Sequence, residues 1–407
     1  MDAPSMESPT LALRDAAVQH GPRPLPLFLD MVREQTEGDA ERRAGILAGL
    51  RAYQTAERPL SPPAMPTVAR VGRATLHDFG GKGRPAVFVP SLINPPIILD
   101  LAEDNSLLRW LSGQGVRPLL VDWGDPTQIL PGTGRGTAPH SGAVEGPHPG
   151  VKPGEDADPP LRSGPLHHAS HGPPPRAGED LSVAGHVTGL LLPLIEQLNE
   201  PAHLVGYCLG GTMALAAAMH AELLSLTLIA SPWHYAGFGQ ARDEIASLWQ
   251  AAKPSSERMG LVPMEVLQSG FWRLDPWRTV TKYEKFGQLD RESAEARAFI
   301  ALEDWANAGA PLTYGAGHEL FEEMIGADVT GNGGWRVGGE VVDPAKIAVP
   351  TLEFVSLHDR IVPAASSARL PDQRLLGLGH VGMIVGSRAR EQLWEPLAAM
   401  LSQAQRS

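Results

Sequence analysis

Short, uninterrupted apolar runs recur along the chain, separated by amphipathic or turn-rich segments. The run PAVFVP at 85–90 is short and continuous, which is typical of a strand buried on both faces of a parallel sheet. The segment 68–77 has the character of an edge strand. On the same reasoning we expect strands over 68–77, 85–90, 116–123, 201–207, 223–232, 345–359 and 374–386.

Apolar residues at helical spacing predict the helices that connect these strands. Two helices are expected between Pro24 and Glu57, with Asp39 as the N-cap of the second. Strand, helix and strand joined by short connections form a βαβ unit, so the sequence predicts an α/β protein with a doubly wound, mostly parallel sheet. The remaining helices are expected over 98–115, 181–199, 212–220 and 390–404.

Two stretches interrupt the sheet pattern and define the expected domains. Between 233 and 339 the strands give way to a helical, aromatic-rich segment, which is expected to form a cap over the site. Ordinary helical packing is the alternative explanation for its aromatic residues. Residues 1–66 are expected to form an N-terminal helical segment and a proline-rich linker. The α/β core would then comprise 67–232 and 340–407.

The second interruption, at 131–178, has a composition unlike the rest of the chain. It contains eleven prolines, ten glycines, five histidines and no aromatic residue. Such a segment buries too little apolar area to offset its ordering entropy, so we expect a disordered insertion. The irregular spacing of its histidines disfavours a metal site. These histidines are residues 140, 148, 167, 168 and 171.

Composition narrows the class of protein further. The net charge of −12 disfavours a nucleic-acid-binding surface, which needs clustered lysine and arginine. A single cysteine excludes an internal disulfide and any cysteine-based metal site. The first residues have no basic and apolar signal pattern, and the longest apolar run, 189–195, is too short to cross a bilayer. The sequence therefore predicts a cytoplasmic protein without a transmembrane segment.

Candidate chemistry centres on Gly206–Tyr207–Cys208–Leu209–Gly210–Gly211, which lies between a predicted strand and a predicted helix. This is the shape of a nucleophile elbow, in which glycines permit a strained turn that exposes the central residue. The following helix would direct its backbone N–H groups at the sulfur and favour the thiolate. The alternative is that Cys208 is a small buried apolar residue.

Asp359 and His380 supply the residues that would complete a triad. Asp359 ends a predicted strand, and His380 follows in a glycine-flanked loop. Cysteine, aspartate and histidine in this order match the chain order of α/β-hydrolases. His380 would accept the thiol proton, and Asp359 would orient the imidazole. A turn histidine and a strand-end cap are the alternatives. The competing histidines lie outside the expected loop; they are His203, His220, His234 and His358.

An oxyanion hole needs two backbone N–H groups that face the acyl oxygen. One is expected from Leu209, directly after the nucleophile. The other is expected from the loop after the strand at 85–90, from either Leu92 or Ile93. The sequence predicts no metal at this site.

Five blocks of the chain resemble the polyhydroxyalkanoate synthase family, the granule-forming polymerases of bacteria within the α/β-hydrolase superfamily. The cysteine block is close to the family's lipase-like box, in which cysteine replaces serine. By match of motif, Cys208, Asp359 and His380 would be nucleophile, acid and base. Arg360 stands where the family usually has histidine, and SPWHY at 231–235 also differs. The blocks are PSLINPPIILDL, RWLSGQGVRPLLVDWGDP, VGYCLGGTMA, VDPAKIAVPTLEFVSLHDRIVP and GLGHVGMIVG.

The resemblance implies an α/β-hydrolase fold with a helical cap inserted before the last strands. It also implies an acyltransferase that moves hydroxyacyl groups from hydroxyacyl-CoA to a growing polyester through an acyl-cysteine. Coenzyme A belongs to the substrate, and no cofactor is expected. Partners implied are the polyester chain or granule, with a homodimer or a second synthase subunit left open.

Two other classes of function stay open at the level of sequence. With water in place of the second hydroxyl, the same triad makes a cysteine hydrolase: a thioesterase, an esterase or an intracellular polyhydroxyalkanoate depolymerase. The departures at Arg360 and 231–235 favour this alternative. A non-catalytic granule-surface protein that kept the fold is the third hypothesis.

Overall fold

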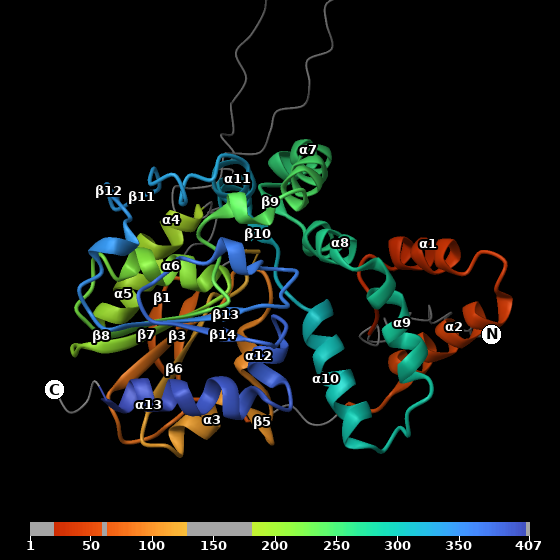
Figure 1. Cartoon of the computed structure of the whole chain (residues 1–407), viewed down its shortest axis with the longest axis horizontal. Coiled ribbons are helices and arrows are strands. Elements are labelled where there is room, and N and C mark those ends of the chain that lie inside the picture. Colours follow the sequence, from red (N-terminus) through yellow and green to blue (C-terminus); the bar gives the residue numbers. More distant parts are fainter. Residues whose placement is uncertain (1–19, 59–62, 128–180, 404–407) are drawn as a thin grey trace, which may run out of the picture.

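A computed structural model describes residues 20–58, 63–127 and 181–403 (Figure 1). Its centre is an eight-stranded sheet whose strands lie side by side in the order β1-β2-β6-β3-β7-β8-β13-β14. From β6 to β14 every neighbouring pair is parallel, whereas β2 is antiparallel to both β6 and β1. The strands are β1 (Thr67–Val71), β2 (Ala74–Asp78), β3 (Pro85–Val89), β6 (Arg117–Asp122), β7 (Ala202–Tyr207), β8 (Leu223–Ile229), β13 (Thr351–Ser356) and β14 (Gln373–Leu376).

The central strands are buried on both faces because helices cover the sheet on both sides. In β3, Val87 and Val89 face one core, and Ala86 and Phe88 face the other. The first face is covered by α4 (Val183–His186), the π-helical segment η2 (Val187–Leu191), α5 (Leu192–Glu196) and α6 (Leu209–Ala217). The second is covered by α3 (Leu107–Ser112), α12 (Gly382–Val385), the π-helical segment η7 (Arg390–Trp394) and α13 (Glu395–Gln403).

A mainly helical region connects β8 to β13, and it packs partly on the sheet core and partly on the N-terminal helices. The fold-class prediction is therefore confirmed: this is an α/β-hydrolase fold with a mostly parallel sheet and a helical insertion. The region contains η3 (Tyr235–Phe238), α7 (Ala241–Met259), α8 (Met264–Leu274), α9 (Pro276–Phe286), α10 (Ala294–Asn307), α11 (Tyr314–His318) and η4 (Glu319–Gly326).

Short elements complete the described chain. Two of the small antiparallel pairs, β9–β10 and β11–β12, belong to the region between β8 and β13. These elements are η1 (Pro96–Leu99), β4 (Asp100–Ala102), β5 (Asn105–Ser106), β9 (Leu261–Val262), β10 (Leu312–Thr313), β11 (Arg336–Val337), β12 (Glu340–Val341), η5 (Pro344–Lys346) and η6 (Ala364–Ser366).

The N-terminal helices α1 (Leu25–Gln35) and α2 (Ala40–Thr55) lie beside α9, away from the sheet (Figure 1). Asp39 caps α2 by accepting a hydrogen bond from the Arg42 N–H, as predicted. The two helices share an apolar core with α8, α9 and α10. Its largest members are Phe28, Tyr53, Trp272, Tyr283 and Phe286.

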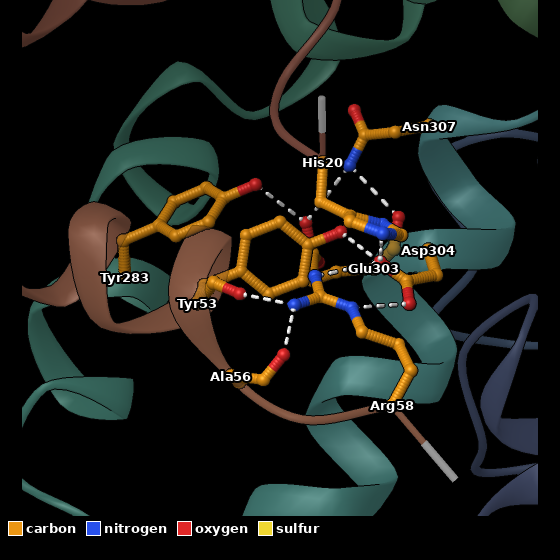
Figure 2. A network of polar contacts seen from close by, with 8 residues as sticks. All are labelled: His20, Tyr53, Ala56, Arg58, Tyr283, Glu303, Asp304 and Asn307. Carbon is orange, nitrogen blue, oxygen red and sulfur yellow. Dashed lines mark hydrogen bonds and ion pairs between the residues drawn. The ribbon is translucent and has the colours of Figure 1, made fainter. Parts of the chain in front are cut away.

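Figure 2 shows a polar network beside the apolar core that α1 and α2 share with α8, α9 and α10. Asp304 of α10 accepts hydrogen bonds from the Tyr53 hydroxyl at 2.5 Å and from two guanidinium nitrogens of Arg58 at 3.1 Å. The His20 Nδ1 atom lies 3.2 Å from the same carboxylate. Asp304 of α10 thus contacts three separate segments of the N-terminal region.

Four element predictions were wrong in whole or in part. The strand expected over 374–386 ends at Leu376, and the helix α12 occupies Gly382–Val385. The strand expected over 345–359 begins only at Thr351, after η5. The strand expected over 68–77 is a hairpin, because Gly72 adopts a positive φ of 55° and forms a two-residue turn with Arg73 between β1 and β2. The helix expected over 98–115 is shortened to α3, which begins after its N-cap Ser106.

An ion pair explains the shortened helix. The residues before α3 form η1 and the β4–β5 hairpin, and Arg109 reaches back to Asp100 with two charge-assisted bonds of 2.7 and 2.9 Å. The predictions for 131–178, including its histidines, fall outside the described residues. Within the described ranges, no helix has the length and apolar character that a bilayer crossing requires.

Candidate active site

Cys208 occupies a tight turn between β7 and α6. Its backbone angles, φ 56° and ψ −133°, lie in a region that side-chain-bearing residues rarely adopt. Its N–H donates to the Ile229 carbonyl at 3.0 Å, and its carbonyl accepts from the Gly211 N–H at 2.8 Å. The strained turn is thus fixed on both sides, and α6 begins at Leu209, three residues before the predicted start.

Three glycines make the turn sterically feasible. A Cβ on Gly206 would collide with the Cα of Gly211, and a Cβ on Gly211 would collide with the Ser231 hydroxyl. A Cβ on Gly210 would collide with the carbonyl oxygens of β3 and of the residue that follows it. The start of α6 therefore packs directly against the end of β3, which brings the β3 loop close to Cys208.

Asp359 and His380 come together from the turns after β13 and β14. The His380 Nδ1 atom lies 2.6 Å from Asp359 Oδ2, and both residues are buried. The other carboxylate oxygen accepts N–H bonds from Ile361 at 2.7 Å and Val362 at 2.9 Å. Asp359 is therefore held in place by backbone donors and directs one oxygen at the imidazole.

The electrostatics of His380 connect it to the cysteine as well. Burial acts to lower the pKa of His380, but the charges of Asp359 and Cys208 and hydrogen bonds to both raise this pKa to about 10. The imidazole is thus stabilised as a cation between a carboxylate and a sulfur. The structure therefore brings the three predicted residues Cys208, Asp359 and His380 together.

Tyr207 also belongs to this site, although sequence reasoning did not identify it. Its ring stacks on the His380 imidazole with centroids 5.0 Å apart, and its hydroxyl donates to the His380 carbonyl at 3.3 Å. The only sequence signal for Tyr207 was its position directly before Cys208. Side chains alternate between the two faces of a sheet, so Tyr207 lies on the opposite face from Gly206.

The backbone N–H groups expected to form the oxyanion hole differ in whether they already donate a hydrogen bond. Leu209 is the first residue of α6, where backbone N–H groups have no acceptor within the helix. The Ile93 N–H, by contrast, already donates to the Ser91 hydroxyl at 3.2 Å. Of the two alternatives in the β3 loop, this hydrogen bond disfavours Ile93 and leaves Leu92.

The competing histidines lie in other environments. His203 is buried in β7, and burial lowers its pKa to about 4. His220 contacts a backbone carbonyl of β11 at 3.1 Å. His234 precedes η3, and burial lowers its pKa. His358 borders the cavity beside Cys208, but no contact joins it to the cysteine in the described chain.

Two cavities meet at Cys208. The first, which we name the large cavity, has a volume of about 650 Å³ and is bordered by His380, Asp359 and several charged residues. The second, which we name the apolar pocket, has a volume of about 100 Å³ and extends from Cys208 and Leu209 toward α7, α8 and η4. Cys208 therefore borders both a cavity that contains charged side chains and a pocket lined by apolar ones.

Ion pairs neutralise much of the charge in the large cavity. Arg360 pairs with Asp275 at 2.7 Å, and Lys282 pairs with the buried Glu303 at 2.7 Å. Arg360 follows Asp359 directly, so its pairing ties the turn after β13 to the start of α9. No cluster of three metal-ligating side chains occurs within residues 20–58, 63–127 and 181–403.

Comparisons with known proteins show which sequences the chain is similar to. The sequence is 23% identical to the poly(3-hydroxyalkanoate) polymerase subunit PhaC of Haloferax mediterranei, covering 91% of this chain and 70% of that protein. It is 22% identical to the PhaC subunit of Allochromatium vinosum, covering 78% of this chain and 81% of that protein. No protein-family model matches the sequence.

Solved structures of low sequence identity are also similar to the chain. A monoacylglycerol lipase from Paleococcus ferrophilus has a TM-score of 0.44 at 15% identity, covering 81% of this chain and 99% of the lipase. A proline iminopeptidase from Mycobacterium smegmatis has a TM-score of 0.40 at 13% identity, covering 84% and 98%. From its sequence relatives and its sheet topology, the chain is a distant homologue of the PhaC polymerase subunits, with an α/β-hydrolase fold.

Proposed function

We propose that this protein is an acyltransferase that moves hydroxyacyl groups from hydroxyacyl-CoA to a growing polyester, with Cys208 as nucleophile. The observation that carries the proposal is the placement of Cys208 on a strained elbow beside the buried His380–Asp359 pair. The names of the PhaC relatives support the substrate class. A thiol nucleophile suits a thioester donor because exchange of one thioester for another is nearly balanced in energy.

In the first half-reaction, His380 takes the proton of Cys208, and the sulfur attacks the thioester carbonyl. The new carbon–sulfur bond to Cys208 forms as the bond to coenzyme A breaks, and His380 returns the proton to the departing thiolate. The N–H groups of Leu209 and Leu92 stabilise the oxyanion that forms between these two steps.

In the second half-reaction, His380 takes the proton from the hydroxyl of another hydroxyacyl group. That oxygen attacks the acyl carbon, the bond to Cys208 breaks, and the sulfur recovers the proton. Residues 233–339 act as a cap in this scheme, since Phe271 and Leu274 of α8 border both cavities. In this scheme the cap must keep water away from the acyl-cysteine, because water would compete with the hydroxyl.

One experiment tests the proposal. Purified protein and its Cys208→Ala variant are incubated with 3-hydroxybutyryl-CoA, and both coenzyme A release and the product are measured. Coenzyme A release with an insoluble polyester, absent in the variant, is the expected result. Thiol alkylation provides a control that Cys208 is accessible. Failure of the intact protein to release coenzyme A while Cys208 alkylates readily would contradict the proposal.

A cysteine hydrolase is the second candidate. The large cavity, at about 650 Å³, leaves room for water next to His380. Water would then take the place of the second hydroxyl, and the products would be free hydroxy acid and coenzyme A. The same experiment separates the two functions, because free acid without polyester identifies the hydrolase.

A further inference from the structure

We infer that the side-chain hydroxyl of Ser91 is a further donor of the oxyanion hole, which makes Ser91 a catalytic residue. The inference rests on the proposed function, because it needs an acyl group to be transferred to Cys208. The donors expected from the sequence motifs are backbone N–H groups, whereas this donor is a side chain of the loop after β3.

Ser91 and Cys208 leave the sheet at the same edge, on neighbouring parallel strands. Val89, the last residue of β3, pairs with Gly206 of β7. Ser91 and Cys208 each follow two residues after this pair, and neighbouring strands lie about 4.8 Å apart. The start of α6 also packs on the end of β3, since a Cβ on Gly210 would lie 2.1 Å from the Val89 carbonyl oxygen. The loop that begins at Ser91 is therefore held beside the elbow.

Ser91 also borders the space in which the acyl group would react. It is only 8% exposed, and it lines the large cavity together with Cys208 and His380. Polar side chains that are buried this deeply usually have their hydrogen-bonding groups satisfied. The hydrogen bonds of the Ser91 hydroxyl therefore indicate what it can bind.

The Ser91 hydroxyl accepts a hydrogen bond but donates none within the described chain. The Ile93 N–H donates to Ser91 Oγ at 3.2 Å. A hydroxyl group carries one proton and two lone pairs, so its proton remains available for a partner. Because one lone pair faces the Ile93 N–H, the proton points away from that N–H. The bond from Ile93 thus fixes the oxygen and leaves the proton free to donate into the cavity.

A donor of this kind suits an oxygen that is negatively charged only during the reaction. When the Cys208 sulfur attacks the acyl carbon, the carbonyl oxygen becomes an anion. The Ser91 proton then has the acceptor that it lacks in the resting protein. It stays on Ser91 Oγ throughout, and its hydrogen bond weakens again when the carbonyl re-forms. Ser91 therefore acts beside the Leu209 and Leu92 N–H groups.

The test compares two reactions of Cys208 in Ser91→Ala and in the original protein. Acylation by 3-hydroxybutyryl-CoA forms an oxyanion, whereas alkylation by iodoacetamide displaces iodide from a saturated carbon and forms none. Mass spectrometry of single-turnover samples measures both rates. Ser91→Ala should acylate about 10²-fold more slowly, the usual effect of removing one oxyanion donor, and should alkylate at the original rate.

Two further variants identify the hydroxyl as the group responsible. Ser91→Thr keeps the hydroxyl, and its extra methyl group has room in the large cavity, so it should retain most of the acylation rate. Ser402→Ala is the matched control, since the Ser402 hydroxyl donates to the Ala398 carbonyl on α13 and borders neither cavity. Both rates should be unchanged in Ser402→Ala.

The remaining outcomes overturn the inference in distinguishable ways. An unchanged acylation rate in Ser91→Ala, an equal loss in Ser91→Thr, or an equal slowing of acylation and alkylation would each leave the hydroxyl without a catalytic role. Faster acylation in Ser91→Ala would show that the Ile93 N–H, released from Ser91, is the donor instead. All of these results leave the proposed function intact. Absence of acylation in the original protein, with Cys208 still alkylated, would instead reject the proposed function and this inference together.

Discussion

At the scale of single residues, His380 is positioned by contacts from three elements. Asp359 binds its Nδ1 atom, Tyr207 stacks on its ring, and Cys208 lies on its other side. This arrangement matters for the proposed chemistry because an imidazole that rotates freely cannot accept the thiol proton efficiently.

Replacement of Asp359 by asparagine should lower the rate of coenzyme A release by about 10³- to 10⁴-fold, because the amide orients the imidazole less well and does not stabilise its cation. Steady-state kinetics with 3-hydroxybutyryl-CoA measure the effect. Asp343→Asn is the control, since Asp343 caps a short surface turn and its variant should retain the activity. A loss of less than tenfold in Asp359→Asn would remove this carboxylate from the proposed mechanism.

The raised pKa of His380 makes the free energy of unfolding depend on pH. The folded pKa of about 10 exceeds the usual value of 6.5, so the stabilisation is complete below about pH 6.5 and is lost as pH rises toward 10. Urea unfolding at several pH values should show this loss in the original protein. In His380→Gln, the stability difference between pH 6.5 and 10 should be smaller, and equal differences in both proteins would contradict the assignment.

The sequence located the candidate site through motifs that determine local geometry, and the catalytic roles of its residues stay predictions. The elbow glycines and the chain order of cysteine, aspartate and histidine were sufficient to select the three residues that the structure brings together. Tyr207 was not identified, because its stacking on His380 depends on how the β14 loop approaches β7. The preference for Leu92 over Ile93 depends on one local hydrogen bond, from the Ile93 N–H to Ser91.

At the scale of elements, α10 connects the N-terminal helices to the large cavity. Asp304 on one side of α10 binds Tyr53 and Arg58 (Figure 2), while Trp305 borders the cavity and donates to the Pro95 carbonyl at 2.9 Å. The network therefore holds in place one wall of the site.

Asp304→Ala should lower the free energy of unfolding by about 2–3 kcal/mol, because it leaves the Nε and Nη2 atoms of Arg58 and the Tyr53 hydroxyl without their acceptor. Chemical denaturation measures this change. Asp30→Ala removes an exposed ion pair with Arg33 and should cost less than about 1 kcal/mol. If both variants lost the same stability, the Asp304 network would contribute no more than an ordinary surface pair.

Sequence patterns were least reliable for the elements around β4 and β5. The apolar residues over 98–115 fit a helix, but the ion pair between Arg109 and Asp100 stabilises a hairpin before α3. The strand predicted over 68–77 is also divided, because the turn at Gly72 separates β1 from β2. Both errors arose because tertiary contacts and turn geometry outweighed local propensity.

At the scale of the whole molecule, the N-terminal helices are part of one continuous structure with the helical region. Their core buries Trp272, Tyr283 and Phe286, which belong to α8 and α9. The α2 and α9 helices approach each other closely at Gly49, where a Cβ would collide with the Tyr283 carbonyl oxygen. The close approach requires glycine at this position.

Gly49→Ala should therefore lower the free energy of unfolding by about 2 kcal/mol, the typical cost of overpacking. Gly45→Ala, one turn earlier on the same helix, should instead stabilise by about 0.5–1 kcal/mol, since alanine favours the helix and meets no atom within 4 Å. Thermal and chemical unfolding of both variants provide the measurement. Opposite signs are expected, and stabilisation by Gly49→Ala would show that α2 does not pack on α9 as described.

The three glycines around Cys208 also limit how the protein can evolve. Any mutation that replaces a glycine adds a side chain. At 206, 210 or 211 that side chain would collide with atoms that can move only at a high cost in free energy. Descendants that keep the nucleophile must therefore inherit these three positions unchanged. New substrate preferences can then arise mainly through the side chains that line the two cavities, where single mutations alter space without disturbing the elbow.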